Sequence, residues 1–199
     1  IISLAKKLLA DAIHPGYGFL SENPNFVKKL DKENIIFIGP SYTAIELMGD
    51  KIQSKIIAKK AGVNCIPGYE KAILNLKEGL QQAKNIGFPV MIKASAGGGG
   101  KGMRIVNEET EFEELLAAAK SEAMNAFGDD RVFIEKYIQK PRHIEMQILA
   151  DNFGNVIWLG ERECSIQRRH QKIIEEAPSS FIDKLTREKM GEQSVKLAK

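Results

Sequence analysis

A run of glycines beside lysines has the clearest chemical meaning in this chain. Gly97–Gly100 are consecutive, Gly102 follows, and Lys93 and Lys101 stand beside them. Successive glycines let neighbouring backbone N–H groups converge on anionic oxygens, and the apolar runs on both sides predict strands. The stretch therefore predicts a strand–loop–strand flap over the phosphates of a nucleotide. A surface hairpin without a ligand is the alternative.

Two lysines occupy positions that local structure disfavours. Lys93 ends an otherwise apolar strand, where an ammonium group normally needs a partner. A nucleotide phosphate would serve, and the alternatives are a carboxylate or an exposed strand end. Lys51 falls in the first turn of a predicted helix, where the helix dipole disfavours a cation. Local rules are broken at functional sites, although solvent exposure is the simpler interpretation of Lys51 taken alone.

A second charged cluster lies at 160–178, in the sequence GERECSIQRRHQKIIEEAP. Its basic and acidic residues are mixed: Arg162, Arg168, Arg169, His170 and Lys172 stand among Glu161, Glu163, Glu175 and Glu176. Mixed sign and strand periodicity favour a pocket for a small anion over a solvated, self-paired surface. An RNA-binding patch is disfavoured because no aromatic residue is interleaved for base stacking. His143 heads a neighbouring strand and could face the same pocket.

Helices and strands must position these residues. Helical periodicity and end signals predict helices at 23–34, 41–49, 50–62, 110–128 and 185–199. Apolar or alternating runs predict strands at 35–39, 89–95, 102–106, 131–138, 143–151 and 156–166, with a hairpin turn at 151–155. Asp50 is expected to cap its helix, and Thr110 with Glu113 to form a capping box.

Alternation within 143–151 predicts a sheet with two unlike faces. Ile144, Met146 and Ile148 alternate with Glu145 and Gln147. Side chains of a strand point to opposite faces in turn, so one face is expected on a core and the other at a polar site.

Composition bounds the class of protein. With 199 residues, 43% hydrophobic and 28% charged, the chain is expected to be globular. A net charge of +3 suits an anionic ligand and is too small to indicate nucleic acid. Cys65 and Cys164 form no metal or disulfide motif, and we interpret both as reduced packing residues. No apolar run is long enough to cross a bilayer.

The chain is expected to be a piece of a longer protein with an α/β (α+β) fold. It opens at the end of a helix and closes in an amphipathic helix. We expect four parts: the end of an N-terminal α/β domain at 1–49, a connecting helix at 50–65, a small lobe with the glycine flap at 66–137, and the start of a catalytic lobe at 138–199.

Six segments together resemble the biotin carboxylase component of biotin-dependent carboxylases. They are HPGYGFLSEN, MGDK, KASAGGGGKGMRIV, EKYI, PRHIE and ERECSIQRRHQKIIEEAP. Their order and spacing agree with that family over essentially the whole chain, and HPGYGFLSEN and QRRHQK are the most specific. Within the family they are most similar to the α subunits of propionyl-CoA carboxylases. Methylcrotonyl-CoA, acetyl-CoA and pyruvate carboxylases share most of them.

The resemblance implies an ATP-grasp fold after the end of a Rossmann-like domain, and carboxylation of biotin by ATP and bicarbonate through carboxyphosphate. The implied nucleotide-binding residues are Lys51, Lys93, Gly97, Gly98, Gly99, Gly100, Glu135, Lys136, Tyr137, Ile138, His143 and His170. Among these, 97–100 would close over the phosphates and 135–138 would be the hinge strand that meets adenine. Lys172 would sit at the bicarbonate end, with Gln167 and His170 as further catalytic residues.

The resemblance also implies Mg²⁺, biotin on a separate carrier domain, a carboxyltransferase subunit and an oligomer, with no nucleic-acid or membrane partner. The family's metal-binding and general-base glutamates lie after residue 199, so no metal ligand is assigned here. The chain alone is therefore expected not to turn over. The implied compartment is the mitochondrial matrix in a eukaryote or the cytoplasm in a bacterium.

Three other functions stay open. A nucleotide-binding regulatory module would share the flap and hinge without requiring QRRHQK. An RNA-binding protein would use the basic cluster, and binding would weaken steeply with salt. Another ATP-grasp ligase, such as a carbamoyl-phosphate synthetase, would share the flap, but HPGYGFLSEN and QRRHQK argue against it.

Overall fold

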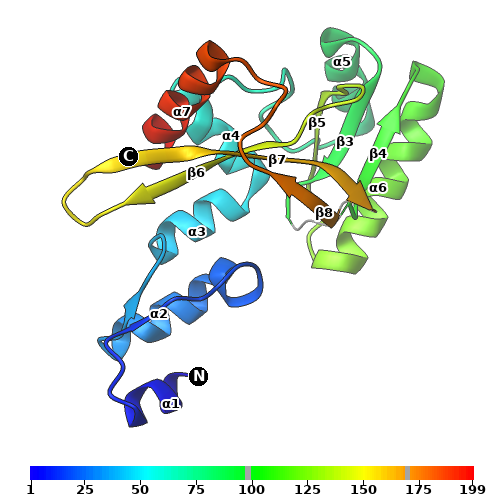
Figure 1. The fold of residues 1–199 in the computed structure, drawn as a ribbon. Helices are drawn as coiled ribbons and strands as arrows, with labels where there is room; N and C mark the ends of the chain where they lie inside the picture. The colour runs from blue at the N-terminus through cyan, green and yellow to red at the C-terminus, as the bar shows by residue number, and fades with distance from the viewer. Residues whose placement is uncertain (97–99, 169–170) are drawn as a thin grey trace. The chain divides into compact units, whose positions relative to one another are not determined.

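The computed structural model describes residues 1–96, 100–168 and 171–199. The chain divides into two compact units, 1–54 and 55–199, and Figure 1 colours their elements along the sequence. The first unit holds α1 (Ile2–Lys7), β1 (Ala12–Ile13), the 3-10 helix η1 (Phe19–Glu22), α2 (Pro24–Lys32), β2 (Ile36–Phe37) and α3 (Tyr42–Gly49). Helix α4 (Lys51–Lys60) begins there and continues into the second unit. The boundaries expected at 49, 65 and 137 stay predictions.

The first unit packs helices on a short parallel pair of strands. β1 pairs with β2, Ala12 opposite Ile36. The predicted helix at 23–34 is confirmed as α2. The Asn23 side chain accepts a hydrogen bond from the Phe26 N–H at 3.0 Å and so caps the first turn. Its buried face includes Phe26 and Leu30 and forms the core of this unit.

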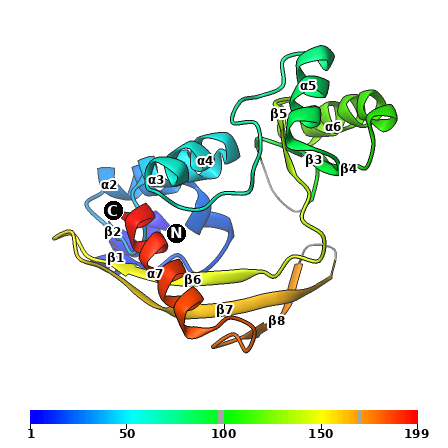
Figure 2. The same cartoon turned by 90° about the horizontal axis from the view of Figure 1, so that it is seen from above.

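The second unit begins with an α+β lobe. Its elements are α5 (Leu76–Ile86), β3 (Val90–Ala94), β4 (Met103–Val106), η2 (Glu109–Glu111), α6 (Phe112–Phe127) and β5 (Val132–Lys136). The strands form an antiparallel sheet in the order β4-β3-β5, and α5 and α6 cover one face of it (Figures 1 and 2). Val90, Ile92 and Ala94 alternate toward those helices and are fully buried. The two strands predicted around the glycine run are thereby confirmed.

The ends of two helices test the capping residues that were predicted from the sequence. Asp50 caps α4 as predicted, since its Oδ1 accepts hydrogen bonds from the backbone of Ile52 at 2.9 Å and Gln53 at 3.0 Å. The capping box predicted at Thr110 is wrong: α6 begins after η2 without a side-chain cap, and the Thr110 hydroxyl donates to Glu108 at 2.7 Å. Helix α5 was not expected from the sequence, and its buried residues are the small Gly79 and Ala83.

The second unit ends in another antiparallel sheet and a helix. β6 (Ile144–Ala150), β7 (Val156–Arg168) and β8 (Gln171–Glu176) are ordered β6-β7-β8, and α7 (Lys184–Ala198) follows. The predicted turn at 151–155 is confirmed: Asp151 Oδ1 accepts hydrogen bonds from the backbones of Phe153 and Asn155, both at 2.9 Å. α7 packs on β6 and β7 (Figure 2).

The two cysteines differ in environment. Both are free thiols; Cys164 is buried and Cys65 is exposed. The interpretation as packing residues is therefore right for Cys164 and wrong for Cys65. Among the helices in the described part of the chain, none is both long and apolar enough to span a membrane.

Candidate functional site

A buried carboxylate with two lysines lies in the α+β lobe. Glu135 of β5 is 5% exposed. Its Oε2 accepts a hydrogen bond from Lys55 Nζ at 2.9 Å, and its Oε1 accepts one from Lys93 Nζ. Burial alone would raise the pKa of Glu135, but the hydrogen bonds from Lys93 and Lys55 outweigh it and hold the pKa below its ordinary value.

Strand register explains how two of these residues meet. Antiparallel pairing of β3 with β5 places Met91 opposite Glu135 and Lys93 opposite Phe133. Lys93 and Glu135 are thus diagonal neighbours on the face of the sheet that α5 and α6 do not cover. The carboxylate partner left open for Lys93 by the sequence is therefore present.

The hinge strand is anchored through its backbone and one side chain. The backbone of Lys136 donates to the Pro67 carbonyl at 2.8 Å, and that of Tyr137 donates to the Pro89 carbonyl at 3.2 Å. The Lys136 ammonium donates to the carbonyl of Gly87 at 2.8 Å and to that of Phe88 at 3.0 Å. Lys136 therefore fixes the strand where it leaves the lobe, while the expected adenine contact of 135–138 stays a prediction.

The described end of the glycine loop is held against α6. The predicted flap residues Gly97, Gly98 and Gly99 lie outside the described residues, whereas Gly100 and Gly102 have φ of +81° and +67°. A Cβ at Gly102 would lie 2.8 Å from that of Ala94, whose N–H donates to the Gly102 carbonyl at 3.0 Å. Positive φ and this close approach both require glycine at position 102.

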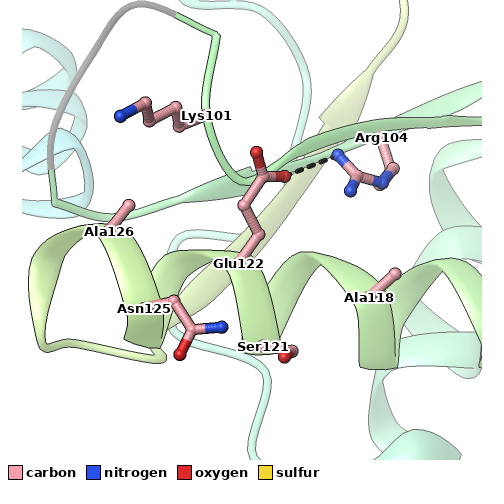
Figure 3. A pocket seen from close by; sticks show the side chains of 7 residues that line it. All are labelled: Lys101, Arg104, Ala118, Ser121, Glu122, Asn125 and Ala126. Atoms are coloured by element: carbon pink, nitrogen blue, oxygen red, sulfur yellow. Dashed lines mark hydrogen bonds and ion pairs between the residues drawn. The ribbon is translucent and has the colours of Figure 1, made fainter.

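Glu122 of α6 forms hydrogen bonds at that end of the loop. Its carboxylate accepts hydrogen bonds from the Gly102 N–H and from Arg104 Nη1, the latter at 2.7 Å, and these bonds lower its pKa. Figure 3 shows Glu122 directed toward Arg104, with Lys101 in the same pocket. The pocket has a volume of about 580 Å³, and its lining residues do not include Lys93 or Glu135.

A network of charged groups covers one face of the β6-β7-β8 sheet. Lys172 Nζ of β8 lies 2.6 Å from Glu145 Oε1 of β6, and Arg162 of β7 contacts Glu145 at 3.4 Å and Glu175 at 3.3 Å. Arg162 also donates to Gln147 Oε1 at 2.6 Å. The hydrogen bond to Glu145 raises the pKa of Lys172, so this group stays cationic at neutral pH. The polar face predicted from alternation in 143–151 is confirmed.

Two other predicted residues lie beside this network. Gln167 is the cross-strand partner of Lys172, and its Nε2 donates to the Cys164 carbonyl at 2.9 Å. The backbone of His143 donates to the Ser165 hydroxyl at 3.0 Å, and its side chain is exposed. His170 lies outside the described residues.

Two further acids of the charged cluster, Glu161 and Glu163, bond to neighbouring segments of the structure. Glu161 accepts both Arg187 Nε, at 2.8 Å, and the Ser179 backbone, at 3.0 Å. Glu163 accepts the Ser179 hydroxyl at 2.6 Å and Arg142 Nη1 at 2.6 Å. These bonds tie β7 to α7 and to the segment before it, so only part of the cluster faces a site.

Comparison with known families decides which family these features belong to. Residues 50–199 match the model for the carbamoyl-phosphate synthase L chain ATP-binding domain, and 1–45 match the biotin carboxylase N-terminal domain. The chain belongs to the biotin carboxylase family. The resemblance inferred from the motifs, and the α/β ATP-grasp fold class, are confirmed.

Relatives of this biotin carboxylase chain cover its whole length. It is 57% identical over 199 residues to the mouse (Mus musculus) mitochondrial propionyl-CoA carboxylase alpha chain, covering 100% of this chain and 28% of that protein. It is 58% identical over 198 residues to biotin carboxylase of Nostoc sp., covering 100% of this chain and 44% of that protein. The chain thus spans less than half the length of these relatives.

Solved structures show the same architecture. The biotin carboxylase domain of Hydrogenobacter thermophilus 2-oxoglutarate carboxylase, in complex with MgADP, ADP and bicarbonate, is 50% identical with a TM-score of 0.91. Biotin carboxylase of Campylobacter jejuni, in a β-γ-ATP complex, is 53% identical with a TM-score of 0.92. Each match covers 99% of this chain and 44% of the other.

The structure of this chain brings some of the predicted site residues together and places further residues beside them. It brings Lys93 to Glu135 and Gln167 to Lys172. Lys51 belongs to the first unit, so its place relative to these residues stays a prediction. Lys55 was not expected at a site from the sequence, whereas Arg162 was expected in the charged cluster and Glu145 on a polar face, neither with an individual role. Lys55 had a usable signal, since it lies one helical turn after Lys51.

Proposed function

We propose that this chain is the nucleotide- and bicarbonate-binding part of a biotin carboxylase, in which ATP and bicarbonate carboxylate biotin on a carrier domain. The observation that carries the proposal is the match over 99% of the chain, with a TM-score of 0.91, to a domain whose structure contains MgADP and bicarbonate. The full protein would be an ATP-dependent ligase within an acyl-CoA carboxylase.

The nucleotide end would be built on the α+β lobe. Lys93 is the next-to-last residue of β3, the strand that leads into the glycine loop, so its ammonium would be placed to neutralise a phosphate. Lys51 would add a second cation, 97–100 would cover the phosphates, and the hinge strand would meet adenine. His143 and His170 would complete the nucleotide pocket.

The bicarbonate end would be the polar face of the β6-β7-β8 sheet. Lys172 is cationic and oriented by Glu145. Its ammonium group would therefore bind the bicarbonate anion, and Lys172 would not act as a base. Gln167, its cross-strand partner, supplies a neutral amide beside it. Bicarbonate oxygen would attack the γ-phosphorus and release ADP. The carboxyl group of carboxyphosphate would then form a C–N bond to a ureido nitrogen of biotin, with release of inorganic phosphate and loss of the proton on that nitrogen. Positioning and charge neutralisation account for most of such catalysis.

Several components of the proposal lie beyond these residues. Among the described residues, no group of three or more His, Cys, Asp or Glu is arranged to hold a metal. We therefore assign no Mg²⁺ ligand and no step to the metal here. The biotin carrier domain, the carboxyltransferase subunit and an oligomeric state belong to the proposed full protein, as does a mitochondrial or bacterial cytoplasmic location.

Substitution of Lys172 in the full-length protein tests the proposal. Lys172→Ala is expected to abolish bicarbonate-dependent carboxylation of biotin while leaving ATP affinity largely unchanged, because Lys172 would act at the anion beside the nucleotide. Lys184→Ala, which removes a lysine whose side chain is 87% exposed, is the matched control. Carboxylation that survives in a folded Lys172→Ala protein would contradict the proposal and favour a regulatory nucleotide-binding module.

The acyl-CoA acceptor is proposed to be propionyl-CoA. Mitochondrial and bacterial propionyl-CoA carboxylase alpha chains are among the relatives, at 57% and 60% identity. Rates with propionyl-CoA, methylcrotonyl-CoA, acetyl-CoA and pyruvate, measured on the assembled enzyme, separate the alternatives. Preference for any of the other three acceptors would overturn this part of the proposal.

A further inference from the structure

Glu135 carries one negative charge and contacts two positive ones. It is 5% exposed, and its two oxygens accept hydrogen bonds from Lys55 and Lys93. One ammonium balances the charge of a buried carboxylate, and each further buried charge costs desolvation energy. The cluster therefore carries one more positive than negative charge, which an anion brought to it would neutralise.

The two lysines are held differently. The Lys55 side chain is 16% exposed, and its Nζ lies 5.6 Å from the centre of the Phe133 ring. A Cβ at Gly68 would lie 2.9 Å from that Nζ and 2.7 Å from the Ile134 carbonyl oxygen, so glycine leaves the room that Lys55 occupies. The Lys93 side chain is 24% exposed, and Lys93 is the next-to-last residue of β3, which leads into the glycine loop. Lys55 is thus the enclosed partner and Lys93 the one beside the loop.

We propose that Lys55 is a positioning residue that keeps Glu135 paired while Lys93 turns toward a nucleotide phosphate. The inference rests on the proposed function, in which Lys93 binds the nucleotide. If Lys93 were the only partner of Glu135, a phosphate would compete with the buried carboxylate for one ammonium and leave the carboxylate unpaired. Leaving a buried charge without its partner is costly. Loss of Lys55 therefore weakens nucleotide binding through Glu135.

Calorimetric titration of the full-length protein with ADP and with the β,γ-imido analogue of ATP tests this role. Lys55→Met is expected to raise both dissociation constants about ten-fold, equivalent to ~1.4 kcal/mol. The KM for ATP should rise with them while kcat changes little, because the loss falls on binding. Lys55→Arg should restore near-normal affinity, since a guanidinium also pairs with a carboxylate.

A double variant separates positioning from a structural role. In a Glu135→Gln background no buried carboxylate needs a partner, so adding Lys55→Met should change nucleotide affinity by less than about two-fold. An equal loss in both backgrounds would overturn the inference. If Lys55→Met does not fold, as judged by circular dichroism, Lys55→Gln keeps a hydrogen-bond donor without the charge and serves in its place.

Lys93→Met distinguishes this inference from the proposed function. Unchanged nucleotide affinity in a folded Lys93→Met protein would overturn the proposed function itself. Weakened affinity in Lys93→Met with unchanged affinity in Lys55→Met would leave the proposed function standing and overturn the role of Lys55.

Discussion

At Glu135, burial and charge pairing oppose each other. Burial raises the pKa of the carboxyl group, and the two ammonium groups lower it further than burial raises it. The ionised form is therefore the one that the fold stabilises. A carboxyl group whose pKa is lower in the folded than in the unfolded state contributes stability above its unfolded pKa, and this contribution disappears as the pH falls through the folded pKa.

The pH dependence of Glu135→Gln checks that sign. Near neutral pH the substitution is expected to destabilise the second unit by about 3–5 kcal/mol, because it leaves two ammonium groups without a carboxylate. The difference from the unsubstituted protein should stay constant above the ordinary carboxyl pKa of 4.5 and shrink below it. Amide exchange of β3 and β5 in the full-length protein measures it. A difference that grows as the pH falls would refute the assignment.

Among the elements, α7 approaches the β6-β7-β8 sheet most closely at a small residue, Gly191. A Cβ at Gly191 would lie 2.4 Å from two atoms of the Trp158 ring, so the helix approaches β7 as closely as glycine allows. Glu161, paired with Arg187, holds the beginning of the helix to the same strand. The helix thus packs against β6 and β7.

Gly191→Ala is expected to push α7 from β7 at a cost of about 1–3 kcal/mol, because the flat ring cannot yield to a methyl group. Trp158 is the only tryptophan in these 199 residues, so in this chain a red shift of its fluorescence is expected to report the change. The neighbouring Glu192→Ala, at an exposed position of the same helix, should leave emission unchanged. Equal emission in the two variants would show that the contact is not close.

At the scale of the whole molecule, two basic residues of the charged cluster have internal partners among the described residues. Arg162 and Lys172 share Glu145, and Arg142, which precedes the cluster, pairs with Glu163. With a net charge of only +3, the chain has a weak positive electrostatic potential and would attract a polyanion only weakly. Paired cations suit a small anion that enters a prepared network better than a long phosphate backbone.

RNA binding by the full-length protein is therefore expected to be no tighter than non-specific binding, with a dissociation constant of about 10⁻⁴–10⁻⁶ M at physiological salt. A filter-binding titration at several salt concentrations measures it, with ADP affinity followed in parallel. Submicromolar RNA binding that weakens steeply with salt would contradict this expectation and restore the RNA-binding alternative.

Local patterns of the sequence were enough to predict the strands around the glycine run, the cap at Asp50 and the polar face of 143–151. Each depends on residues a few positions apart, where periodicity and turn chemistry act directly. The capping box predicted at Thr110 was wrong for an equally local reason. The 3-10 helix η2 contains Thr110, so α6 begins later than the capping signal indicated.

The partners of the functional lysines were decided by tertiary structure. Lys93 meets Glu135 from 42 positions away, and Lys55 meets it from 80. A pattern of neighbouring residues cannot predict contacts between residues so far apart in the sequence. These contacts depend on strand order, on register and on the face of the sheet that the helices leave uncovered. From the sequence, Lys93 could only be expected to have a partner, because it stands in an otherwise apolar strand. Only the packing of α4 beside β5 decided that this partner is shared with a second lysine.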